Sequence, residues 1–135
     1  MNGVNVIGDL LRASADITAV VPVERIRAGA LPQQTALPAI VVESISLNDR
    51  NILQPGDTRM VRERVQVTVL APNYRQKNDI LRLVRKVCAD RRANLSSQSD
   101  VVVLTDGAGP DFMADDASFW MQNQDFSVSY NESTV

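Results

Sequence analysis

The chain has 135 residues, with 14 Lys plus Arg against 16 Asp plus Glu, no histidine and one cysteine. This length suits one domain (1-135) with a single packed core, and 44% hydrophobic with 22% charged residues is typical of a globular protein. The missing histidine excludes Ser-His and Cys-His nucleophiles, and a lone thiol excludes both a disulfide framework and the usual structural zinc sites.

The first half of the chain predicts a helix and then strands. Apolar residues at helical spacing predict a helix over 4–13, and 16–21 adds a short second turn that Pro22 stops. Residues 24–27 fit a short strand that leads into a loop. The Ile- and Val-rich stretch 39–47 predicts a buried strand.

A strictly alternating strand is predicted over 61–70. Val61, Glu63, Val65, Val67 and Val69 share one face, and polar side chains occupy the other. With the strand at 39–47 it forms a hairpin, whose long polar loop covers 48–58.

The main helix is predicted over 74–92, with Asn73 as its N-cap. One apolar stripe follows its length (Ile80, Leu81, Val84, Val87, Cys88). Cys88 is therefore expected to pack in the core. The order of elements predicts an α+β domain: a mostly antiparallel sheet with a long hairpin, packed against an N-terminal helix and one long central helix.

After the main helix we expect a strand over 101–105 and a turn over 107–110. The last long strand is expected over 118–130, with one face formed by Trp120, Phe126, Val128 and Tyr130. The carboxylates Asp111, Asp115 and Asp116 lack the glycine turn and terminal Glu of a calcium loop, so we expect a solvated acidic loop and no metal site.

Charge is divided unevenly along the chain. Residues 75–92 hold seven basic and two acidic side chains, whereas 93–135 hold seven acidic and no basic ones. Such asymmetry suggests faces of opposite sign, which can pair within the monomer, across a subunit interface or with another partner. The alternative is a solvated basic helix beside an acidic surface.

The arginines at 59, 62 and 64 lie on or beside a strand that we interpret as edge-like. Aromatic residues make up only 4% of the chain and the pI is about 5.0, which argues against a dedicated DNA-binding protein. Ion pairing across a subunit interface fits Arg59, Arg62 and Arg64 better, as does protection of a strand edge. The apolar pair Ile52 and Leu53 either folds back on the core or is offered to a partner.

The N-terminal segment lacks the basic region and apolar stretch of a signal peptide. The longest apolar runs, such as 39–42 and 101–104, fall far short of the roughly 20 residues that a membrane helix needs. We therefore expect a protein made and used in a cytoplasm, without a membrane partner.

Several segments, in this order, resemble the tail-completion proteins of long-tailed bacteriophages. The resemblance covers about residues 8 to 132. Its segments are Asp16–Pro22, Arg25-Ile26, Gly29–Gln33, Leu37–Val42, Arg64–Pro72, a helix with Val84-Arg85, and Asp125–Glu132.

The resemblance implies a structural virion protein without catalysis or cofactor. Such proteins form a ring, typically a hexamer, on the head-proximal end of the tail tube; the ring stops polymerisation, binds the head connector and lets DNA pass through its hole. For this chain it implies tube protein and connector as partners, and DNA that passes without sequence-specific binding.

A ring needs two different faces that complement each other. The candidate interface residues are therefore Ile52, Leu53, Arg59, Arg62, Arg64, Arg82, Arg85, Asp115 and Asp116. The alternatives are a head-tail connector or other minor neck component of similar fold, and a regulatory or accessory domain of a cytosolic hydrolase.

Overall fold

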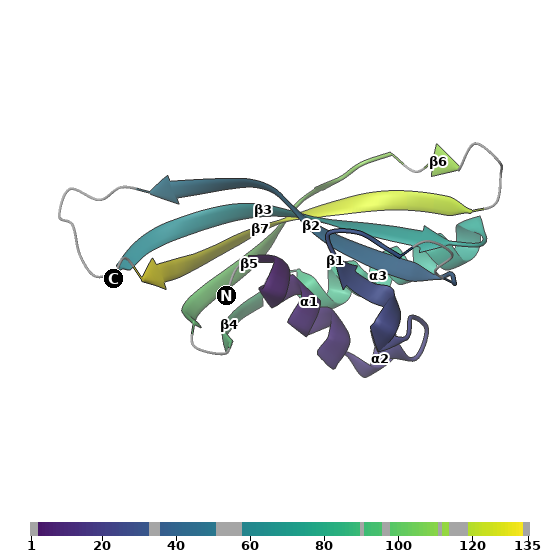
Figure 1. Ribbon diagram of the computed structural model, residues 1–135, viewed down its shortest axis with the longest axis horizontal. Coiled ribbons are helices and arrows are strands. Elements are labelled where there is room, and N and C mark those ends of the chain that lie inside the picture. The colour runs from purple at the N-terminus through teal and green to yellow at the C-terminus, as the bar shows by residue number, and fades with distance from the viewer. Residues whose placement is uncertain are drawn as a thin grey trace.

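A computed structural model describes residues 3–32, 36–50, 58–89, 91–95, 98–110, 112–113 and 119–133. In this part of the chain, two helices begin the fold and one separates the long hairpin from the later strands (Figure 1). The elements are α1 (Gly3–Ala13), α2 (Ala15–Thr18), the 3-10 helix η1 (Val23–Arg25), β1 (Ile26–Ala28), β2 (Ala39–Arg50), β3 (Thr58–Ala71), α3 (Tyr74–Cys88), β4 (Arg91–Leu95), β5 (Gln98–Ala108), β6 (Phe112–Met113) and β7 (Trp120–Ser133).

The strands form one sheet in the order β1-β2-β3-β7-β5-β4, and β6 pairs with the start of β7. All pairs are antiparallel except β1 with β2. β3 pairs with β7 along its whole length, from Thr58 opposite Ser133 to Ala71 opposite Trp120. The predicted α+β fold with a mostly antiparallel sheet and a long hairpin is confirmed.

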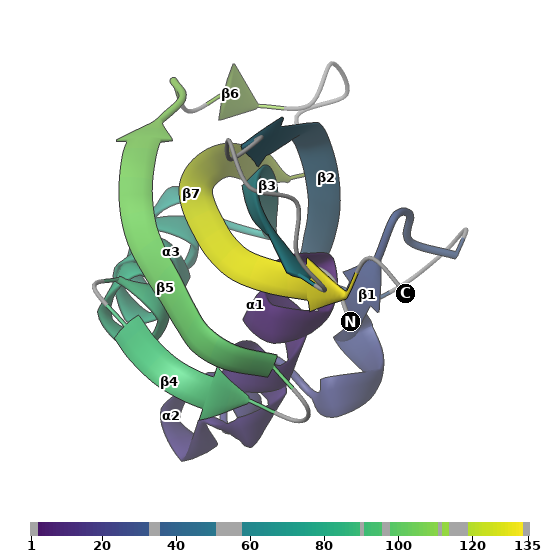
Figure 2. The same cartoon turned by 90° about the vertical axis from the view of Figure 1, so that its left-hand side faces the viewer.

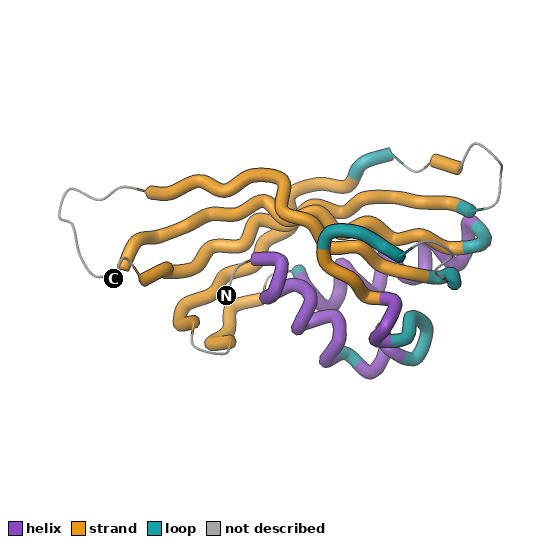
Figure 3. Tube along the Cα trace, in the orientation of Figure 1, coloured by secondary structure: helices purple, strands orange, loops and turns teal. Residues whose placement is uncertain are grey.

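All three α-helices lie on the same face of the sheet (Figures 1 and 3). The sheet is strongly curved, and β5 and β4 bend toward the helix side (Figure 2). The core lies between the helices and this concave face, where Ile7, Leu11, Ile80 and Phe126 are fully buried. Burying each such side chain stabilises the fold by roughly 1.5–3 kcal/mol.

The N-cap and apolar stripe predicted for α3 and the alternation predicted for β3 are confirmed. The side chain of Asn73 accepts a hydrogen bond from the Gln76 N–H at 2.8 Å, which satisfies one of the unpaired donors at the start of α3. The apolar stripe of α3 faces the sheet, with Cys88 buried. On β3, the side chains from Val61 to Val69 at alternate positions are buried against the helices.

The structure differs from the sequence predictions around the end of α3. This helix ends at Cys88, and Arg91 and Arg92 belong to β4, whereas we expected helix through 92. β4 pairs with Val101–Val103 of β5, so pairing with a distant strand outweighs local helix preference. The strand expected over 24–27 begins only at Ile26, and β5 continues through the glycine expected to turn.

β3 is a central strand, not the edge-like strand that the sequence suggested. It pairs with β2 on one side and with β7 on the other. Its arginines therefore cannot protect a sheet edge, and the side chains of Arg62 and Arg64 lie on the face opposite the helices.

Candidate interaction surfaces

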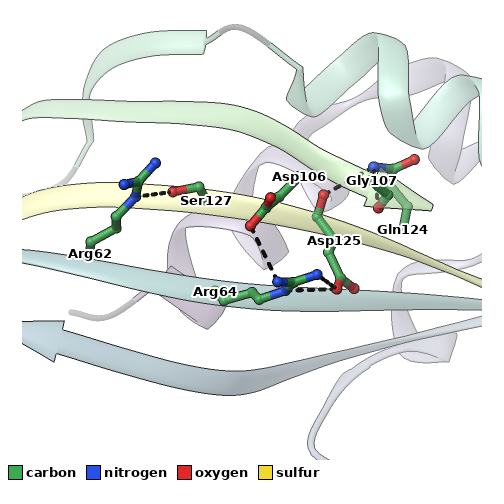
Figure 4. A network of polar contacts seen from close by, with 7 residues as sticks. All are labelled: Arg62, Arg64, Asp106, Gly107, Gln124, Asp125 and Ser127. Atoms are coloured by element: carbon green, nitrogen blue, oxygen red, sulfur yellow. Dashed lines mark hydrogen bonds and ion pairs between the residues drawn. The ribbon is translucent and has the colours of Figure 1, made fainter. Parts of the chain in front are cut away.

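Arg64 joins three strands on the open face of the sheet. From the middle of β3, its Nε donates to Asp125 Oδ2 of β7 at 2.9 Å, and its Nη2 lies 2.8 Å from the same oxygen. Its Nη1 lies 3.7 Å from Asp106 Oδ2 of β5 (Figure 4). Part of the acidic C-terminal third thus pairs with a basic residue within the chain.

The same contacts raise the pKa of Arg64 above its ordinary value, first through the hydrogen bond from its guanidinium to Asp125 and then through the field of Asp106. Arg64 remains 45% exposed. Because solvent screens such a pair, it orders the surface more than it stabilises the fold.

Arg62 lies beside Arg64 on this face and donates from Nε to Ser127 Oγ at 2.8 Å (Figure 4). The two arginines line a shallow hollow of about 310 Å³, together with Ser46, Asp106 and Ser127. The hollow holds two cations and one carboxylate, so its surface is polar and mixed in sign.

A second surface lies on α3. Arg82, Arg85 and Lys86 line a hollow of about 610 Å³, whose remaining wall is Asn78, Leu81, Ala89 and Thr105 of β5. All three basic side chains are exposed. Within the described residues no ion pair is recorded for them. This basic hollow is therefore available to an acidic partner.

The structure brings the predicted interface residues together in two groups. Arg62 and Arg64 share the open sheet face, whereas Arg82 and Arg85 share the outward side of α3. The backbone of Arg59 pairs with Glu132 in the ladder from β3 to β7, but its side chain is outside the described residues. The candidates Ile52, Leu53, Asp115 and Asp116 also lie outside the described residues.

Glu63 is a buried carboxylate that we did not single out from the sequence. Its Oε1 accepts from the Gly3 N–H at 2.9 Å and from the Tyr130 hydroxyl at 3.0 Å. Glu63 therefore fixes the first residue of α1 to the sheet, and the positive end of the helix dipole favours a carboxylate there. The available signal was its place as a charged residue among the valines of the alternating strand predicted over 61–70.

Lys77 is a second buried charge missed by the sequence analysis. Its Nζ donates to Gln122 Oε1 at 2.7 Å and lies 4.5 Å from the centre of the Tyr74 ring. Tyr74 in turn packs edge-on against Trp120. This cluster ties the start of α3 to the start of β7. The signal was the position of Lys77 one turn before the apolar stripe.

A hard-cation site needs several carboxylates close together. Among the described residues, no group of three or more His, Cys, Asp or Glu side chains could hold a metal ion. None of the described helices is both long and apolar enough to span a membrane.

Comparisons with known proteins give a family match and a separate match of fold. The family model described as "Tail completion protein gp17" matches residues 6–128. A solved chain from the "Virion of native gene transfer agent (GTA) particle" has the same fold, with a TM-score of 0.76 and 12% identity over 93% of this chain and 92% of that chain. No curated protein sequence matches this chain.

Proposed function

The chain belongs to the family of the tail completion protein gp17 and is a structural component of a phage tail, and we propose that it forms a ring that caps the head-proximal end of the tail tube. In this proposal the ring stops tube polymerisation and provides the surface to which the head connector binds. DNA passes through its central channel. The observation that carries the proposal is the family match over residues 6–128.

The arrangement of charge supports a ring. A ring is built from heterologous contacts, in which one face of each subunit meets a different face of the next. Arg82 and Arg85 offer such a face, because they line a basic hollow and have no ion pair among the described residues. We propose that they pair with acidic groups of the neighbouring subunit, while Arg64 is already committed to Asp125 and Asp106.

The overall charge also suits a channel for DNA. Each basic contact to phosphate adds affinity through counterion release, so a conduit must offer few of them. The chain carries a net charge of −2, and the proposed commitment of its arginines to protein contacts leaves few for phosphate. The DNA would thus pass without being held.

A second candidate is a head-tail connector or another minor neck component of similar fold. It differs from the first in its binding partner, because it would bind the head vertex and not the end of a bare tail tube. The fold likeness to a virion chain at 12% identity is compatible with both positions.

Electron microscopy of the purified protein, alone and mixed with tail tubes that lack it, tests the proposal. We expect rings that cap one end of each tube and tubes that stop growing when capped. Rings that bind head connectors but ignore tubes would support the second candidate. Monomers that bind neither, at high protein concentration, would refute both.

The charge-pairing part of the proposal is tested by Arg82→Glu with Arg85→Glu. We expect this double variant to fold and to lose ring formation, because the basic hollow becomes acidic. Arg27→Glu with Arg75→Glu is the matched control: it makes the same change in net charge at exposed residues outside the hollow. Rings that form equally in both variants would show that the hollow does not contribute to assembly.

A further inference from the structure

At each edge of the sheet, a short outer strand covers only part of the longer strand beside it, and no described strand covers the rest. On one side, β1 pairs with Ile40–Val42 only, so β2 is bordered by β3 alone from residue 43 onward. We call residues 43–50 the open β2 segment. On the other side, β4 pairs with β5 only as far as Val103, which leaves an open β5 segment over residues 104–108.

The backbone groups on these segments point outward at alternate residues. Val42 accepts from the Gly29 N–H at 2.9 Å, so its N–H and C=O face the β1 side. The bulge between Ser44 and Ser46 shifts this alternation by one residue, which directs the N–H and C=O of Leu47 to the same side. No described residue pairs with Leu47 there.

The same alternation continues through the regular ladders of β3 and β7 to β5. It directs the backbone groups of Val103 toward β4 and those of Thr105 to the same side, beyond the end of β4. Among the residues that the structure describes, both margins thus present donors and acceptors without a partner, which are a template for another strand.

Exposed apolar side chains mark the same two margins. Ile45 and Leu47 on the open β2 segment are 50% and 51% exposed, and Leu104 on the open β5 segment is 45% exposed. Native proteins usually protect open edges with charge or proline or by covering them. These three positions carry neither charge nor proline, and no described strand covers them, as expected for margins that another chain covers.

The two margins complement each other in direction. β2 runs antiparallel to β3, β3 to β7 and β7 to β5, so β5 runs opposite to β2. Suppose that a second copy lies beside the first and that both copies have their helices on the same side of the continuous sheet. The β5 of the second copy then runs antiparallel to the β2 of the first. The alternating order of the sheet continues across the boundary.

We propose that neighbouring copies of this chain join by strand addition, with the open β2 segment of one copy hydrogen-bonded to the open β5 segment of the next. This inference rests on the proposed ring, and it identifies the contact that builds it. Because the contact is heterologous, its repetition about a rotation axis closes a circle of strands. The partner is a second copy of the same chain.

The positions of the open segments fit such a circle. Through the ladders, Leu104 lies level with Ser46, and Ala108 lies level with Val42. The open part of β5 thus extends toward the end of the sheet where β1 covers β2, so neighbouring copies must be offset along the strands. Closed sheets require this offset, because their strands tilt relative to the axis.

The basic hollow lies at the same margin as the open β5 segment, since Thr105 forms part of its wall. A neighbour that adds its β2 to this margin comes next to Arg82 and Arg85. Strand addition and charge pairing therefore concern one subunit boundary, and they are separable by substitution.

Leu47→Pro tests the backbone contact. Proline removes the outward N–H of residue 47 and leaves the hydrogen bonds from β2 to β3 intact, because those come from the neighbouring residues. Leu47→Thr is the matched control, since it keeps the N–H and removes the apolar side chain. We expect Leu47→Pro to stay folded by circular dichroism and to elute as a monomer, whereas Leu47→Thr retains rings.

Cross-linking tests which edges meet. Cysteines replace Leu47 and Thr105, while buried Cys88 stays as it is, and a short thiol cross-linker is added to assembled protein. The double variant is expected to give a ladder of covalent multimers on denaturing gels, and each single variant to stay monomeric. Dimers from Leu47→Cys alone would overturn the proposal in favour of pairing between two β2 strands.

The outcomes separate this inference from the proposed function. If the Leu47→Pro variant forms rings and the variant with cysteines at 47 and 105 gives no ladder, strand addition is refuted and the cap proposal is unaffected. A ladder from protein that ignores tail tubes would support strand addition and refute the cap. Wild-type protein that forms neither rings nor a ladder would refute both.

Discussion

Tyr130→Phe measures how firmly the sheet holds the start of α1. The Tyr130 hydroxyl donates to Glu63 Oε1 at 3.0 Å, and the two residues are 3% and 1% exposed. A hydrogen bond to a charged group contributes about 1.5–3 kcal/mol, and a buried carboxylate that loses a donor is not rescued by water. We expect a loss of about 2 kcal/mol in the free energy of unfolding, which lowers Tm by ~6–10 °C in a domain of this size.

The assay is chemical and thermal unfolding at one fixed protein concentration, because assembly itself changes apparent stability. Tyr74→Phe is the control: it removes the same group from a residue that is 47% exposed, and phenylalanine keeps the ring against Trp120. Because water can replace the partner of an exposed hydroxyl, this variant should lose less stability than Tyr130→Phe. Glu63→Gln completes a double-mutant cycle with Tyr130→Phe. Independent, additive effects of these two substitutions would show that the hydrogen bond does not form.

Three further predictions concern stability. Gly3→Ala should destabilise the fold by about 1–3 kcal/mol, because the added Cβ would lie 2.9 Å from Val65 Cγ2, a packed side chain. Gly8→Ala should be neutral or stabilising by up to about 1 kcal/mol, since its nearest neighbour is the flexible end of an arginine; equal losses in urea titrations of the two variants would refute the reasoning. Lys77→Met keeps the buried stem but leaves Gln122 Oε1 without its donor at 2.7 Å, so it should cost less than Lys77→Ala, which should cost about 2–5 kcal/mol because it also opens a cavity; calorimetry that ranks them in reverse would contradict this. Arg64→Gln should lower the stability only slightly, because the pair is exposed to solvent, and salt should shrink the difference from wild type. Because carboxylates raise the pKa of Arg64, its contribution is fully present below the unfolded-state pKa and is lost only as pH rises through a still higher folded-state pKa. The stability difference should therefore stay constant between about pH 7 and 10, and a decrease across that range would contradict the pairing.

Local patterns were sufficient to predict most of the elements. The alternation from Val61 to Val69 fixed a strand and its buried face, and the apolar stripe with Asn73 fixed the start and orientation of α3. The predicted end of α3 was wrong. Arg91 and Arg92 have no local signal for a strand, and they are held in β4 by pairing with Val101–Val103.

The candidate sites were less predictable for the same reason. Arg64 and Asp125 are 61 residues apart, and nothing in either local sequence shows that the ladder from β3 to β7 places them side by side. The sequence showed a concentration of basic residues over 75–92. It did not show that Arg82 and Arg85 border a hollow beside β5.

The sequence by itself excluded histidine chemistry and predicted the α+β class and the alternation of β3. It also showed the resemblance to tail-completion proteins. These features depend on composition and on patterns within short segments. The tertiary structure decided which strands are central and which margins are open. It made β3 central and buried Glu63 against Gly3, and among the described residues it left 43–50 of β2 and 104–108 of β5 without a strand on their outer sides. Strand order is a property of contacts between distant segments, and it is these contacts that determine where a second copy can join.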